Sequence, residues 1–180
     1  ISFVIVGAVI YFVVIKPIEV IKARQAKTEA EAPPAPSVED LLVEMAAALG
    51  RVHAVGLCHG RPHPRDMFRR ADGTWGYLDF EEEPEAAMPL ATAQARDVWV
   101  LFMQIVARAQ LEDTGARAFA AWRAEAPAGI VPELRKAVSR LSLALPGLRL
   151  LRPVGLGKDG RNLLDAIAFL RSALRAGPNP

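Results

Sequence analysis

Hydrophobic positions divide the chain into an unbroken apolar run at its start and amphipathic segments further on. Residues 1–15 carry no charged side chain. From residue 38 onward, apolar residues recur every three or four positions, the spacing of a helix that buries one face. This pattern predicts helices over 38–52, 95–106, 116–126, 132–145 and 162–176. We therefore expect a mostly α-helical chain.

One short β-hairpin is predicted between residues 69 and 80, inside the helical pattern. Asp72-Gly73 is typical of a two-residue turn in which both residues adopt positive φ. The strand after it, Trp75–Phe80, would bring Asp79 back beside Asp66. Two carboxylates held together, with acidic residues following, are typical ligands of a hard cation such as Mg²⁺. The alternative is turn chemistry, in which Asp66 caps a turn and Asp79 ends a strand.

The apolar run at the start predicts one transmembrane helix. As a helix it would span roughly 22 Å, short of the ~30 Å hydrocarbon core unless upstream residues complete it. Tyr11 and Phe12 near its polar end suit a membrane interface, and the positive side chains after them indicate a cytoplasmic exit: Lys16, Lys22, Arg24 and Lys27. Residues 1–27 would then form a membrane helix and a basic juxtamembrane segment. A buried strand or core helix is the alternative for the apolar run.

A linker over residues 28–37 follows the apolar segment. Its prolines, alanines and glutamates cannot bury a hydrophobic core. Ser37 is a good helix N-cap, with Asp40 three residues later. The sequence thus predicts a boundary here, with a separate helical lobe over 38–180.

Composition and charge exclude some classes of function. The formal net charge is +2, and no basic stripe with interleaved aromatics is present, so we expect no nucleic-acid partner. Cys58 is the sole cysteine, so no intramolecular disulfide can form. We interpret Cys58 as a small buried hydrophobic residue.

Residues 1–45 resemble the second transmembrane helix and cytoplasmic tail of the large-conductance mechanosensitive channel family. The residues that carry the resemblance are Ser2-Phe3, Val9–Phe12, Lys16-Pro17, the Pro/Ala/Glu linker and Val38–Glu44. It implies a lipid bilayer as partner, self-association through 1–45, and a bacterial inner membrane location with the C-terminal lobe cytoplasmic. No counterpart of the family's first, pore-lining helix is present, so this chain alone would not build the channel.

Residues 46–180 resemble the C-lobe of the protein-kinase-like fold, in its lipopolysaccharide and aminoglycoside kinase branch. Leu49–Gly60 matches the helix that leads into the catalytic loop. Asp66 falls on the loop asparagine, and Asp79-Phe80-Glu81 matches the metal triplet. The resemblance implies Mg²⁺ and ATP held at Asp66 and Asp79. It also implies that His59 supports the loop and that Asp97 hydrogen-bonds the loop backbone; a helix N-terminal acid is the alternative for Asp97.

Arg61 departs from this pattern, because it stands where the family has its general-base aspartate. An arginine stays protonated and cannot accept a proton from a substrate hydroxyl. Upstream of His59 the sequence has no Gly-rich phosphate loop and no strand lysine, which also argues against phosphoryl transfer. Three hypotheses stay open. The chain is a channel-related membrane protein with an inactive appended lobe, a small-molecule or lipopolysaccharide kinase-like phosphotransferase remnant that binds Mg²⁺–nucleotide, or an accidental join of two unrelated parts.

Overall fold

The computed structural model of the protein describes residues 16, 18–22, 36–79, 82–150 and 157–176. The chain divides into two compact units, Ile1–Pro36 and Ser37–Pro180. In the first unit, residue 16 and residues 18–22 are helical. The predicted membrane span over 1–15 and most of the predicted linker lie outside the described residues. Within the described part of the chain, every helix is too short or too polar to cross a membrane.

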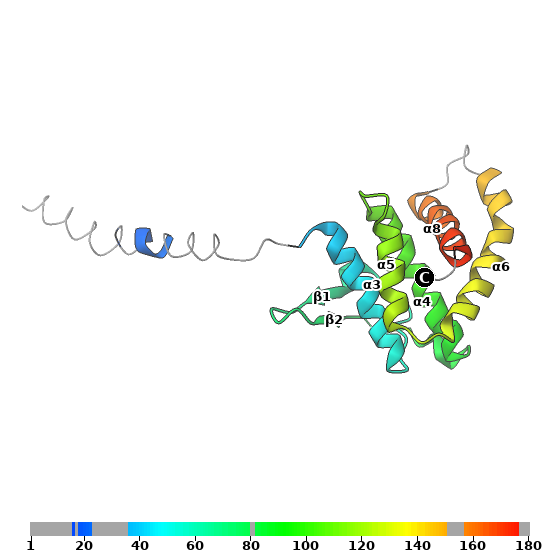
Figure 1. The fold of residues 1–180 in the computed structure, drawn as a ribbon, viewed down its shortest axis with the longest axis horizontal. Helices are drawn as coiled ribbons and strands as arrows, with labels where there is room; N and C mark the ends of the chain where they lie inside the picture. Colours follow the sequence, from blue (N-terminus) through cyan, green and yellow to red (C-terminus); the bar gives the residue numbers. More distant parts are fainter. Residues whose placement is uncertain (1–15, 17, 23–35, 80–81, 151–156, 177–180) are drawn as a thin grey trace, which may run out of the picture. The chain divides into compact units, whose positions relative to one another are not determined.

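The second unit is mostly helical and contains one small hairpin, as the hydrophobic pattern predicts (Figure 1). Its elements follow in chain order: α3 (Val38–Ala54), the 3₁₀ turn η2 (Pro64–Asp66), β1 (Met67–Arg69), β2 (Trp75–Tyr77), the 3₁₀ turn η3 (Pro84–Ala86), α4 (Leu90–Arg108), α5 (Thr114–Glu125), α6 (Ile130–Leu150) and α8 (Lys158–Arg175).

Helix α4 is the centre of this unit. Helix α3 packs along α5 on one side of α4, and α6 and α8 pack on the other (Figure 1). The face that α4 buries carries Val98, Leu101, Phe102 and Ile105, all inaccessible to solvent. Phe102 stacks on Phe169 of α8, with ring centroids 5.6 Å apart. The core around α4 therefore joins the first helix of the unit, α3, to the last, α8.

Helix α3 is fixed at its start by two acceptors. The Ser37 hydroxyl accepts a hydrogen bond from the Asp40 backbone N–H at 3.1 Å, as the N-cap prediction requires. Glu39 is buried and accepts from the Gln110 backbone N–H at 2.8 Å and from the Thr114 hydroxyl. The bond from Thr114, followed by that from Gln110, holds the pKa of the Glu39 carboxyl below its usual range. Glu39 thus ties the first turn of α3 to the connection between α4 and α5.

Gly50 sets the closest approach of α3 to α5. A Cβ at this position would lie 2.7 Å from Glu125 Cβ and 2.8 Å from the Trp122 carbonyl oxygen. Helices can approach this closely only where one of them lacks a side chain. This contact places the C-terminal end of α3, from which the candidate loop departs, against α5.

The hairpin differs from its prediction in two ways. The second strand ends at Tyr77, so Asp79 lies beyond it. The turn is also longer than two residues, because Arg69 pairs with Trp75 and the Gly73 N–H donates to the Arg70 carbonyl. Gly73 has φ of 85°, whereas Asp72 does not adopt positive φ. Instead the Asp72 carboxylate accepts from the Thr74 N–H at 2.9 Å and from its hydroxyl at 2.6 Å. That local bond selects a longer loop with one left-handed glycine.

Helix α4 begins at Leu90, five residues before the predicted start. Asp97 is therefore inside the helix rather than in its first turn, and the interpretation of Asp97 as a helix N-terminal acid is wrong. The early start has a simple cause: the segment Leu90–Gln94 contains no glycine or proline, and Pro89 ends the preceding turn. Asp97 consequently faces the protein interior from the middle of a rigid element.

Candidate functional site

The candidate site is the loop that joins α3 to β1. Gly56 lets the chain leave α3, because its φ of 78° is strained for other residues and its N–H donates to the His53 carbonyl at 3.0 Å. Gly60, with φ of 92°, makes the next sharp change of direction. The segment between them carries Cys58 and His59, both buried.

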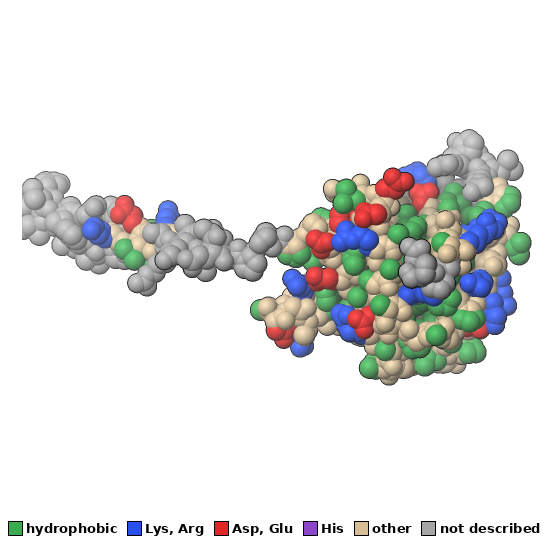
Figure 2. Space-filling model, viewed as in Figure 1, with side chains coloured by type: hydrophobic (Ala, Val, Ile, Leu, Met, Phe, Trp, Pro, Cys, Tyr) green, Lys and Arg blue, Asp and Glu red, His purple; other side chains and the backbone are tan. Residues whose placement is uncertain are grey.

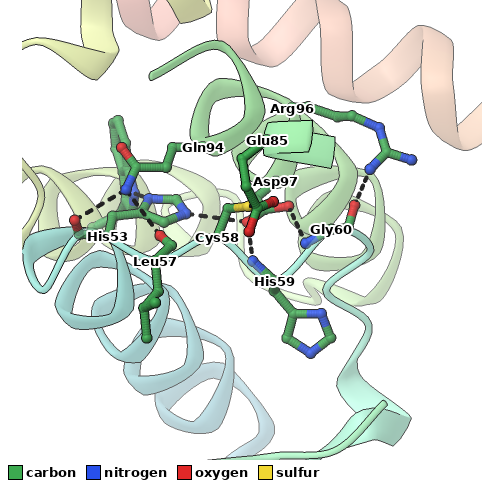
Figure 3. A network of polar contacts seen from close by, with 10 residues as sticks. His53, Leu57, Cys58, His59, Gly60, Glu85, Gln94, Arg96 and Asp97 are labelled. Atoms are coloured by element: carbon green, nitrogen blue, oxygen red, sulfur yellow. Dashed lines mark hydrogen bonds and ion pairs between the residues drawn. The ribbon is translucent and has the colours of Figure 1, made fainter. Parts of the chain in front are cut away.

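Asp97 holds this loop through its backbone. One carboxylate oxygen accepts from the His59 N–H at 2.6 Å, and the other accepts from the Gly60 N–H at 2.9 Å (Figure 3). The carboxylate is fully buried, so these bonds are charge-assisted and shielded from water. This is the contact that the kinase-like resemblance implies for Asp97.

Gln94, one turn earlier on α4, holds the start of the loop. Its side-chain amide donates to the carbonyls of His53 at 3.0 Å and Leu57 at 2.8 Å (Figure 3). Gln94 and Asp97 therefore satisfy backbone acceptors and donors of the loop from a single helical face. Gln94 was not among the site residues predicted from the sequence. Its spacing of three residues from Asp97, on an otherwise apolar face, was the available signal.

His53 lies between Asp97 and a tryptophan from α5. The Trp122 indole N–H points at His53 Nδ1 at 3.3 Å, and His53 Nε2 lies 3.4 Å from the Asp97 carboxylate. An indole nitrogen can only donate, so Nδ1 must be the acceptor and Nε2 must carry the proton. His53 therefore donates to Asp97 in this arrangement. Three elements, α3, α4 and α5, meet at this buried chain of polar groups.

Arg96 and Glu82 close the loop on its outer side. A guanidinium nitrogen of Arg96 donates to the Gly60 carbonyl, and another lies 2.7 Å from Glu82. The segment that carries Glu82 runs directly over Gly60, where a Cβ would meet the Glu82 carbonyl oxygen at 2.7 Å. Only glycine fits under this backbone. The Glu82 side chain is exposed, but it is paired with Arg96.

Arg61 lies next to two carboxylates. Its Nη2 is 3.8 Å from Asp79 Oδ2, and its Nε is 3.7 Å from Glu82 Oε1. Asp79 has φ of 65° and is the non-glycine residue with positive φ among those described. Such a backbone costs free energy and is usually imposed by the surrounding structure. Arg61, at the position expected for the general base, is thus a cation that lies beside Asp79, the expected metal ligand.

Asp66 is brought close to the Asp79 segment by backbone pairing. The Leu78 N–H donates to the Asp66 carbonyl at 2.7 Å, which extends the hairpin by one bond. Asp66 Oδ1 lies 3.3 Å from Arg65 Nε, while its Oδ2 is buried and accepts no hydrogen bond from the described residues. Within the same residues, no group of three or more His, Cys, Asp and Glu side chains is placed to hold a metal ion. Asp66 and Asp79 each have a guanidinium within 4 Å, so a cation held by these two carboxylates would have to compete with Arg65 and Arg61. The Mg²⁺ site stays a prediction from the sequence.

The other polar residues of the loop have structural contacts. His59 packs its ring on Tyr77 of β2 at a centroid distance of 5.3 Å. His63 Nδ1 accepts from the Arg65 N–H at 3.1 Å and caps η2. Burial, and then the neighbouring Arg108, lowers the pKa of His63. The His59 ring thus packs the loop against β2, and the His63 ring fixes the end of the loop where η2 begins.

Cys58 is buried, as predicted, but it is not a purely apolar contact. Its thiol donates to Glu85 Oε2 at 2.7 Å (Figure 3). Burial, followed by this hydrogen bond, raises the pKa of the Cys58 thiol to about 12. A thiol with so high a pKa is a poor nucleophile. Cys58 therefore joins the loop to η3 as a neutral thiol.

Comparisons with protein-family models, with characterised proteins and with solved structures find no match to this chain. The channel-like and kinase-like resemblances therefore remain predictions from the sequence. What the structure adds is the geometry of the loop around Asp97 and the charge opposite Asp79.

Proposed function

We propose that this chain is a membrane-anchored protein of ion-channel ancestry, joined to a kinase-like helical lobe that does not transfer phosphoryl groups. The single observation that carries the second half is the position of Arg61. Its guanidinium lies within 4 Å of both Asp79 and Glu82. The lobe keeps the framework of a phosphate-transfer loop while replacing its reactive group.

Two physical arguments support an inactive lobe. Arg61 cannot act as general base, since its guanidinium does not release a proton near neutral pH. It also supplies a fixed positive charge beside Asp79. A divalent cation would have to displace this guanidinium, and the two like charges would repel each other in the partly buried site.

The anchored half rests on the sequence of residues 1–45. The uncharged run over 1–15, followed by Lys16 and further basic residues, supports a helix in the bacterial inner membrane with the lobe in the cytoplasm. The resemblance to a channel family supports self-association through the same 45 residues. The framework around Asp97 supports the lobe as a stable binding or spacer module.

The test separates the two halves of the proposal. The full chain is expressed in bacteria, membranes are washed with alkaline carbonate, and the detergent-extracted protein is titrated with ATP in the presence of Mg²⁺. We expect to find the chain in the washed membranes. We expect calorimetry to detect no heat of ATP binding. A soluble chain would contradict the anchor.

Binding of ATP that requires Mg²⁺ would contradict the inactive lobe and support the phosphotransferase-remnant alternative. In that case Asp79→Ala must abolish binding. Asp72→Ala, which removes a carboxylate from the tip of the same hairpin, is the matched control and must leave binding intact. An effect of both variants would indicate damage to the hairpin rather than a lost ligand.

A further inference from the structure

A groove between α6 and α8 lies away from the loop site. Its volume is about 580 Å³. Three arginines line it, Arg135 from α6 and Arg171 and Arg175 from α8, together with hydroxyls of Ser139 and Ser142. On the same side of α6, Lys136 and Arg140 line an adjoining groove. Figure 2 shows Lys and Arg side chains, in blue, gathered on the right of the view, over α6.

Among the described residues, the arginines of this face are not paired with a carboxylate, whereas its lysine is. Elsewhere in the described lobe most arginines have a carboxylate within 4.0 Å: Arg51, Arg61, Arg65, Arg69, Arg96 and Arg117. Within the described residues, by contrast, Arg140, Arg171 and Arg175 have no ion pair, and Arg135 donates to the Leu174 carbonyl. Glu133, the acid on this part of α6, is paired with Lys136 at 2.7 Å.

An apolar side chain stands among these cations. Leu143 of α6 also lines the groove, and 82% of its surface is exposed, more than for any other large apolar residue described. Exposed leucine surrounded by arginine and lysine on one helix is typical of elements that lie in the headgroup region of a membrane. Here the apolar side chain can enter the interface while the arginines reach lipid phosphates.

We propose that this basic α6–α8 face, defined as Arg135, Lys136, Arg140, Leu143, Arg171 and Arg175, docks on the headgroups of an anionic bilayer leaflet. The inference rests on the proposed function in one respect. An anchor in the same membrane would hold the face near its ligand at a high effective concentration. The cytoplasmic leaflet carries the required negative charge.

Two features favour a lipid surface over a nucleic acid. None of the described side chains that line the groove is aromatic, so bases would have no described ring on which to stack. Leu143 would gain nothing from a phosphodiester backbone, whereas a bilayer interface buries it. Free inorganic phosphate shares the charge but not the apolar contact, and the experiment includes it.

The test uses the full chain with a fluorescent reporter on this face. Cys58→Ser removes the native thiol while keeping a donor to Glu85, and Ser139→Cys carries a polarity-sensitive dye. A matched protein carries the dye at Ala71→Cys, on the exposed tip of the hairpin, which lies on the opposite side of the unit (Figure 1). Both are mixed with vesicles of phosphatidylcholine alone or with one third phosphatidylglycerol, and sedimentation is measured in parallel.

We expect a blue shift at position 139 with anionic vesicles, no shift with neutral vesicles, and none at position 71. Near 1 M salt the shift should disappear, because the Debye length falls to about 3 Å. Arg171→Glu should raise the anionic lipid concentration that gives half of the maximal shift by at least about tenfold. Arg70→Glu, which reverses another exposed arginine outside this face, should leave it unchanged. Circular dichroism of both variants checks the fold.

The outcomes separate this proposal from the membrane anchor. A chain that sediments with both vesicles but shows no shift at position 139 overturns the docking face and leaves the anchor standing. A chain that sediments with anionic vesicles alone, with the shift, overturns the anchor and supports the face. Equal effects of Arg171→Glu and Arg70→Glu overturn the assignment to this face. A shift produced by inorganic phosphate without vesicles shows that the ligand is a soluble anion and overturns the lipid assignment.

Discussion

The carboxylate of Asp97 lies 2.6 Å from the backbone nitrogen of His59, which comes 38 residues earlier in the chain. The same carboxylate accepts from Gly60 and faces His53. A single buried side chain on α4 thus sets the path of the loop that leaves α3. The bonds that shape the loop do not involve Arg61, so the shape of the loop does not depend on the residue at that position.

Replacement of Asp97 by asparagine should destabilise the lobe strongly. An amide has one oxygen, so one of the two loop N–H groups would lose its acceptor and face an NH₂ group instead. The loss of a charge-assisted bond and of a buried partner should cost about 3 kcal/mol. Urea unfolding measures this cost, and amide hydrogen exchange should show faster exchange at His59 and Gly60. Unchanged exchange at these two amides would contradict the role given to Asp97.

Replacement of Arg61 by glutamine should change stability little. Its two ion pairs, at 3.8 and 3.7 Å, join side chains that are 32–53% exposed. Exposed pairs of this kind contribute about 0.2–1 kcal/mol. The urea midpoint of Arg61→Gln should therefore stay close to that of the parent protein. A loss as large as that of Asp97→Asn would mean that Arg61 is part of the framework.

Gly50→Ala should destabilise the lobe, although alanine is the better helix former by about 1 kcal/mol. The added methyl group would collide with Glu125 Cβ and the Trp122 carbonyl, and overpacking of this kind typically costs about 1–3 kcal/mol. Gly129→Ala is the matched control, because nothing lies within 4 Å of the new Cβ. Thermal unfolding distinguishes them. A melting temperature raised by Gly50→Ala would mean that α3 and α5 lie further apart.

Cys58 should react slowly with alkylating reagents in the folded protein. A thiol pKa of about 12, compared with an ordinary value of 9.0, reduces the thiolate fraction near neutral pH about a thousandfold. Iodoacetamide labelling followed by mass spectrometry should show little modification until urea is added. Glu85→Gln should speed the native reaction, since it removes a negative charge and an acceptor beside the thiol. Fast labelling of the native parent protein would contradict the buried contact.

Stability should fall as the solution becomes acidic. The pKa of Glu39 in the folded state lies below its ordinary value of 4.5 because Thr114 and Gln110 donate to it. The folded state therefore binds protons less readily than the unfolded state near that pH. The stability that Glu39 provides is present above its ordinary pKa and is lost as pH falls through the lower, folded-state value.

The pH dependence of urea unfolding between pH 6 and 3 tests this expectation. Glu39→Gln removes the titrating group and should flatten the acid limb. Thr114→Val keeps the carboxylate but removes the donor that lowers its pKa most, so it should flatten the limb in part. An acid limb that is equally steep in all three proteins would contradict the role of the Glu39 contacts.

Much of the fold could be predicted from local patterns. Apolar residues at helical spacing predicted the helices of the lobe, and Ser37 predicted the start of α3. These features follow from neighbours within one or two turns, where sequence and geometry are tied by the helix repeat. Asp72 shows the limit even at short range. Its side chain bonds Thr74 and selects a loop that the Asp-Gly pair alone did not indicate.

The candidate site needed the tertiary structure. From the sequence came the loop, the pairing of the Asp66 and Asp79 segments, and the unusual Arg61. Three further facts depend on contacts across the fold: Gln94 bonds the loop beside Asp97, Glu82 passes over Gly60, and Arg61 faces Asp79 and Glu82. A periodic pattern records which face of a helix is buried. It does not record which polar group from elsewhere in the chain meets that face, because packing of the whole core decides that.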